Sequence, residues 1–197
     1  MTARTENESE KLPFSTASWT PDGANHWRQA GGSELSVTSS KTSADGKFQS
    51  EPLFRDTMLR EILGRGGGLV SADLTGQGLS AVGAVIAKFP QKPSGMTYEG
   101  WLVFVRDGTD YRVAVRFPEV GTTGVRDTAV MMIWMNGRPD DADPLEGWML
   151  DPYDRTRRDP LMRNVADDDV HDAKFPSHPL TLVRLELRRI QASLAPR

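Results

Sequence analysis

The chain has 197 residues, a formal charge of −3 from 24 basic and 27 acidic residues, and no cysteine. The lack of thiols excludes disulfides, thiolate zinc sites and a cysteine nucleophile. The charges are nearly balanced, so the chain does not have the basic excess that is typical of nucleic-acid-binding proteins. No apolar run approaches the roughly 20 residues that span a bilayer, and the first residues lack the apolar stretch of a secretory signal.

The N-terminal quarter of the chain has the weakest pattern. Residues 1–12 carry almost no apolar side chain, which predicts a flexible tail. Residues 13–50 are rich in Ser, Thr, Gly and Asp, which favour turns, and we expect one or two short strands there, with residues 34–39 the better candidate because Leu35 and Val37 alternate with polar residues. We expect residues 13–197 to form a single domain, with 13–50 as its irregular N-terminal part.

The middle of the chain predicts one helix followed by several strands. Ser50 can cap the helix and Gly64 can end it, and the apolar residues between them recur at steps of three and four. The turn residues Asp107 and Gly108 then separate a segment that is apolar on both faces, 96–105, from a strongly alternating one, 111–117, as in a tight hairpin. Strands are predicted at 69–74, 80–89, 96–105 and 111–117.

Two more helices are predicted nearer the C-terminus. One begins near Thr123 and ends at Gly137, and it is apolar at every position from Ala129 to Met135, so we expect it to be largely buried. The last helix follows Ser177 and carries one apolar stripe. Three helices and about five strands in mixed order predict an α+β fold, in which helices flank a twisted, mainly antiparallel sheet.

A strap of about 40 residues, 137–177, joins the last two helices. Unstructured loops of this length are uncommon in compact domains, and the apolar residues spread along the strap argue against disorder. We expect it to bind a protein partner, because tryptophan, tyrosine and arginine suit protein interfaces. The candidate residues are Trp148, Tyr153, Arg155, Arg157 and Arg158, together with Trp19 and Trp27 from the N-terminal part.

The acidic run "ADDDVHDAKFPSHP" supports an alternative hypothesis, a hydrolase or metal-dependent enzyme that uses the 167–171 cluster. Asp167, Asp169 and His171 offer carboxylate and imidazole ligands. However, the run contains neither a D-x-D-x-D-G loop nor an H-E-x-x-H motif. We therefore interpret the run as a solvated face, and we expect no metal and no cofactor.

Three segments, "GMTYEGWLVF", "GTTGVRD" and "WMLDPYD", resemble an uncharacterised bacterial family over roughly residues 50 to 194. The resemblance implies no activity, so no catalytic or binding residue is carried over. The order of elements is similar to that of Mog1/PsbP-like domains, in which a twisted antiparallel sheet packs between helices. We therefore expect a cytoplasmic, non-catalytic protein-binding or accessory module; a structural or immunity-type partner of a neighbouring gene product is a further possibility.

Overall fold

The computed structural model describes residues 12–41, 50–76, 81–139, 143 and 145–194. The predicted flexible tail therefore lies, apart from Leu12, outside the described residues. In chain order the elements are β1 (Thr20–Pro21), β2 (His26–Arg28), β3 (Glu34–Lys41), α1 (Glu51–Gly64), β4 (Gly68–Thr75), β5 (Val82–Pro90), β6 (Met96–Arg106), β7 (Thr109–Pro118), α2 (Val125–Asn136), the 3-10 helices η2 (Val165–Asp167) and η3 (Asp169–Lys174), and α3 (Pro179–Ser193).

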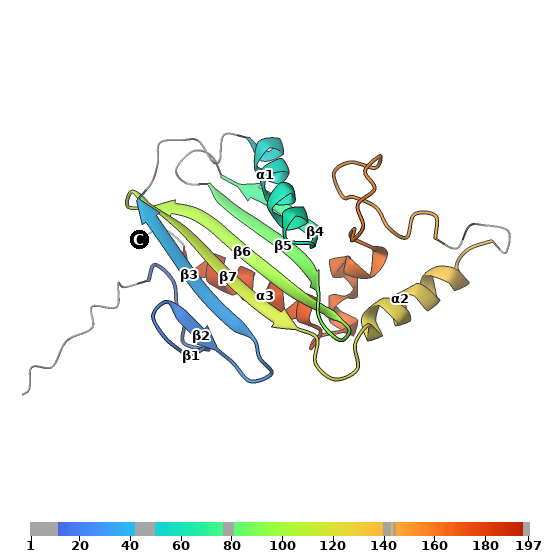
Figure 1. Ribbon diagram of the computed structural model, residues 1–197, viewed down its shortest axis with the longest axis horizontal. Coiled ribbons are helices and arrows are strands. Elements are labelled where there is room, and N and C mark those ends of the chain that lie inside the picture. The colour runs from blue at the N-terminus through green and yellow to red at the C-terminus, as the bar shows by residue number, and fades with distance from the viewer. Residues whose placement is uncertain (1–11, 42–49, 77–80, 140–142, 144, 195–197) are drawn as a thin grey trace, which may run out of the picture.

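The strands of the described residues form one antiparallel sheet in the order β1-β2-β3-β7-β6-β5-β4 (Figure 1). The predicted hairpin is its centre, because β6 and β7 pair over ten positions. Asp107 and Gly108 both have positive φ, 50° and 70°, as the tight turn between two twisted strands requires. The fold is therefore α+β with a single antiparallel sheet, as the sequence predicts.

The number of strands is a correction, since the sheet has seven strands and not about five. The two additional strands, β1 and β2, lie in the N-terminal part and contain two and three residues. Strands this short have too few positions to show an alternating pattern. They depend instead on non-local pairing, such as that of Trp27 with Leu35 across β2 and β3.

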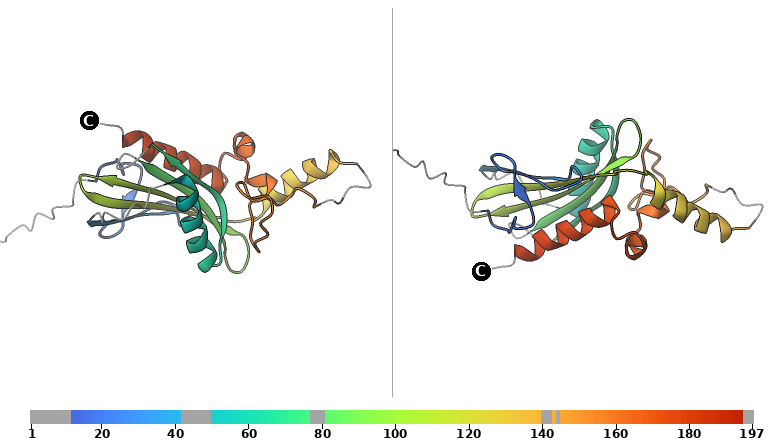
Figure 2. Two further views of the ribbon diagram at one scale, coloured as in Figure 1. Left: turned by 90° about the horizontal axis from the view of Figure 1, so that it is seen from above. Right: turned by 90° about the horizontal axis from the view of Figure 1, so that it is seen from below.

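Helix α3 covers one face of the sheet and helix α1 covers part of the other (Figure 2). On the α3 face, Val183 and Leu187 pack into the main core beside β6 and β7. Gly100 of β6 lies directly beneath the helix, where a Cβ atom would come within 2.6 Å of Val183. On the other face, Phe54 of α1 packs over Gly83 of β5 in the same manner.

Helix α2 is the largest departure from the sequence prediction. It extends beyond the end of the sheet (Figure 2), and its buried residues are only Arg126 and Val130. Val130 packs with Trp148 and Ala166 of the strap in a small third core. The prediction of a largely buried helix was wrong, because α2 lies beyond the sheet and packs mainly against the strap.

No helix of the described residues has both the length and the apolar character needed to cross a membrane.

Candidate functional site

The acidic run forms a buried clamp. The carboxylate of Asp167 lies 2.6 Å from the Nζ atom of Lys88, and the two side chains are only 1% and 4% exposed. Asp167 also accepts a hydrogen bond from the backbone N–H of Asn164, which in turn caps η2. A buried charge requires a partner of opposite sign, so Lys88 on β5 fixes the strap to the sheet.

A second buried cation, Arg126, connects α2 to the strap and to α3. Its side chain is 1% exposed and donates to the carbonyl oxygens of Ala166 and Asp168 at 2.6 and 2.7 Å. It also donates to Asp172 Oδ1 at 2.9 Å and to Thr181 Oγ1 at 3.0 Å. The guanidinium group is therefore satisfied by the chain itself, and its role in this position is to hold three elements together.

The candidate metal ligands are not brought together by this arrangement. Asp167 is occupied by Lys88, whereas Asp169 is exposed. Burial, and then the charges of Arg126 and Lys174, lower the pKa of His171, because desolvation and nearby cations both disfavour the charged imidazolium. Within the described part of the chain, no group of three or more acidic or histidine side chains is positioned to hold a metal ion.

The two aromatic residues of the predicted binding surface anchor the strap. Trp148 is 6% exposed and packs against Trp134 of α2 with ring centroids 6.2 Å apart. The hydroxyl group of Tyr153 accepts the backbone N–H of Ala72 at 2.7 Å, and the Arg55 guanidinium lies 3.8 Å from the Tyr153 ring centre. Arg55 donates to the Ala72 carbonyl oxygen as well, so the backbone of the edge strand β4 is capped at Ala72.

The remaining residues of the predicted binding surface range from exposed arginines to buried aromatic residues. Arg155 and Arg158 are exposed and Arg157 is half-buried, with its Nε atom 4.0 Å from Asp151. Trp19 is buried, and its indole N–H donates to Glu186 of α3 at 2.6 Å. Trp27 is half-buried against the main core. The aromatic residues chosen from the sequence are thus mainly packing residues.

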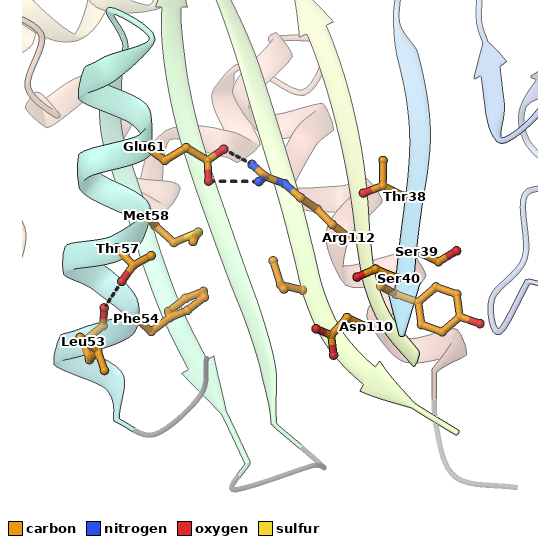
Figure 3. Close-up of a pocket in the computed structure, with 12 residues that line it drawn as sticks. Thr38, Ser39, Ser40, Leu53, Phe54, Thr57, Met58, Glu61, Asp110 and Arg112 are labelled. Atoms are coloured by element: carbon orange, nitrogen blue, oxygen red, sulfur yellow. Dashed lines mark hydrogen bonds and ion pairs between the residues drawn. The ribbon is translucent and has the colours of Figure 1, made fainter. Parts of the chain in front are cut away.

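A largely apolar cleft lies between α1 and the uncovered half of the sheet (Figure 3). Its volume is about 480 Å³, which is within the range of small-ligand pockets. Arg112 of β7 and Glu61 of α1 form a two-pronged ion pair across it, at 2.6 and 3.1 Å. The cleft can hold an apolar group, but its charged pair is already internally satisfied. The lining residues include Leu53, Phe54, Met58, Val103 and Tyr111.

A buried glutamate and histidine also lie close together, Glu119 after β7 and His178 before α3, with Oε1 and Nε2 3.6 Å apart. Burial opposes ionisation of Glu119, but the neighbouring His178 and hydrogen bonds from the backbone N–H groups of Gly124 and Met96 outweigh it and lower the Glu119 pKa. The other imidazole nitrogen, Nδ1, accepts the backbone N–H of Leu180. Nε2 is buried and faces Glu119 without forming a hydrogen bond, and the pair brings the loop after β7 next to the start of α3.

The exposed apolar surface lies elsewhere, on the arm formed by α2 and the strap. Among the described residues, ten of the twelve exposed large apolar side chains lie between positions 120 and 170. With 3.6 residues per turn, Val125, Ala129 and Met132 share one side of α2 with the exposed Asn136, and the buried Arg126 and Val130 lie on an adjacent side. Flanking this side are Ile133 and Met135.

Sequence reasoning missed this surface because it interpreted an apolar helix as a buried one. A signal was available in the pattern, since residues 129–135 of α2 are apolar on all sides of the helix while α1 and α3 have polar outer sides. A helix of that kind needs two neighbours, and here the chain supplies only the strap.

No family model matches the chain, and no curated protein matches it significantly. This result agrees with the resemblance to a family that has no assigned activity.

Proposed function

We propose that this protein is a non-catalytic binding module that holds a partner protein against the exposed side of α2. The single observation that carries the proposal is the exposure of Met132 and Ile133, at 62% and 57%, on a helix that projects from the body. Contiguous exposed apolar surface is rare on monomeric proteins and commonly marks a protein interface. Methionine is enriched at such interfaces, and its flexible side chain adapts to the partner.

The anchoring of α2 supports this role. Arg126 and Val130 hold the helix through their own buried contacts, so the exposed residues are not required to keep it in place. The helix has only two ionisable residues: Arg126 is buried, and Asp127 accepts a hydrogen bond from Asn164 at 2.7 Å. An apolar partner surface could therefore cover this side without burying an unpaired charge.

A non-catalytic role is supported by the use that the chain makes of its buried polar groups. Asp167, Asp172 and His178 each lie within ion-pair distance of a side chain from another element. They act as structural clamps, and this leaves the hydrolase or metal-enzyme alternative without an observation that favours it.

The proposal also includes the architecture and the cellular location of the protein. We propose a Mog1/PsbP-like architecture, which the single antiparallel sheet flanked by helices supports at the level of fold class. We also propose that the protein works in the cytoplasm, since it has no cysteine.

Photo-cross-linking in the native host tests the binding surface. A photoreactive phenylalanine analogue replaces Met132 in one variant and Leu185, an exposed residue of α3, in the control variant. We expect a discrete cross-linked species from position 132 and none from position 185. Equal labelling from both positions, or none from either, would contradict the proposal.

A further inference from the structure

We infer that the partner held against α2 is a second copy of this chain, related by a two-fold axis, with the two α2 helices antiparallel. This inference rests on the proposed function, since it names the occupant of the same surface. A two-fold contact brings each residue close to residues of the same patch on the other copy. It is therefore favourable only if that patch is free of like charges that would meet.

The exposed side of α2 meets this condition. Met132, Ile133 and Val125 are exposed, and neither of the ionisable residues of the helix faces a second copy, since Arg126 is buried and the half-buried Asp127 points away toward the strap. Ala129 lies between Val125 and Met132 along this side, and a small residue there lets two helices approach closely. The contact surface is uncharged and, apart from Asn136, apolar, so it is compatible with itself.

The charges at the two ends of α2 select the antiparallel orientation. At the tip of the arm, the Glu146 carboxylate is 77% exposed, and Arg138 lies 3.6 Å from it while packing on the ring of Trp134. At the base, the exposed Lys174 lines the same hollow, of about 430 Å³, as Val125 at the N-terminal end of α2. A helix N-terminus also carries partial positive charge.

Antiparallel packing joins opposite charges twice. The helix has 12 residues and is about 18 Å long, so the exposed Glu146 of one copy reaches the exposed Lys174 of the other, and the symmetry repeats the contact. Parallel packing would instead bring the two Glu146 carboxylates together and the two Lys174 ammonium groups together. Electrostatic complementarity of this kind fixes the register of an interface.

Sedimentation equilibrium over a range of protein concentrations up to about 1 mM tests the inference, since this range populates even a weak contact. We expect the mass to rise from one chain to two. Ile133→Glu should weaken association at least tenfold, whereas Leu185→Glu, the matched exposed control on α3, should leave it unchanged. Circular dichroism and thermal unfolding confirm that each variant is folded.

A charge exchange tests the orientation. Glu146→Lys and Lys174→Glu should each weaken association, and the double variant should recover it, because both ion pairs are then restored with reversed signs. A single-chain mass at every concentration, dimers unaffected by Ile133→Glu, or a double variant no better than the single ones would overturn the inference. If the chain stays monomeric while position 132 still cross-links to a different protein, the proposed function stands and only the second copy is rejected.

Discussion

The two C-terminal helices differ in how much of their apolar surface the chain itself covers. Helix α3 has one apolar stripe and buries it completely against the sheet, through Leu180, Val183, Leu187 and Ile190. Helix α2 has more apolar residues for its length but buries only Val130 and the aliphatic stem of Arg126 fully. The apolar content of a helix therefore indicates how much apolar surface must be buried, but not whether the same chain or a partner buries it.

The largest expected loss of folding stability comes from a change at the attachment of α2 to the body. Arg126→Leu removes the donor shared by Ala166, Asp172 and Thr181 and leaves buried acceptors unpaired. We expect a loss of about 3–5 kcal/mol in the free energy of unfolding, measured by urea denaturation. Arg188→Leu, at an exposed position of α3, is the control and should change it by less than about 0.5 kcal/mol. Equal effects of the two changes would refute the clamp.

A matched pair of truncations sharpens the contrast between the two helices. Leu187→Ala on α3 empties a core position and should cost about 2–5 kcal/mol. Ile133→Ala on α2 removes a side chain that is largely in water and should change the stability of the monomer by less than about 0.5 kcal/mol. The measurement is urea denaturation at a protein concentration where the chain is monomeric. A large cost at Ile133 would show that the exposed side of α2 is covered by this chain.

The attachment of the strap to β4 gives a smaller effect. Tyr153→Phe keeps the ring under Arg55 but removes the hydroxyl group that accepts the Ala72 N–H. We expect a loss of about 1 kcal/mol and faster hydrogen exchange at the Ala72 amide, followed by mass spectrometry or NMR. Exchange at Leu102, in the centre of the sheet, serves as the reference and should change less. If the Ala72 amide keeps its wild-type protection, Tyr153 is not its cap.

The smallest expected effect is a dependence on pH. Because the folded state holds the pKa of Glu119 below its ordinary value of 4.5, the unfolded chain binds the proton more readily. The stabilisation is present above about pH 4.5 and is lost as the pH falls through the folded-state pKa. Glu119→Gln should therefore give a flatter fall in stability below pH 4.5, measured by urea denaturation at several pH values. An equal slope for wild type and variant would rule out this contribution, and Glu146→Gln, at an exposed carboxylate, should keep the wild-type slope.

The parts of the fold that the sequence predicts are those in which local pattern and tertiary packing agree. The hairpin around Asp107 and Gly108, the cap at Ser50 and the stripe of α3 all show a period that matches their buried side. The short strands β1 and β2 are beyond such reasoning, because their pairing is decided by distant residues.

The candidate site was less accessible to sequence reasoning for a similar reason. The residues of the acidic run do not by themselves show that distant cations neutralise its charge. Lys88 lies 79 positions from Asp167, and Arg126 lies 46 positions from Asp172. Likewise, residue type alone does not distinguish a tyrosine that anchors the strap, such as Tyr153, from a tyrosine that contacts a partner. Only the position of each side chain in space distinguishes them.

The exposure of the α2 side chains can be measured most directly by limited oxidation of methionine in dilute, monomeric protein. Met132 and Met162 have opposite environments, 62% and 5% exposed, and peptide mass spectrometry follows both in one sample. The structure predicts rapid oxidation of Met132, slow oxidation of Met162, and protection of Met132 when the concentration is raised or the partner is added. Slow oxidation of Met132 in the dilute monomer would contradict the account, because it would mean that this chain already covers the surface assigned to a partner.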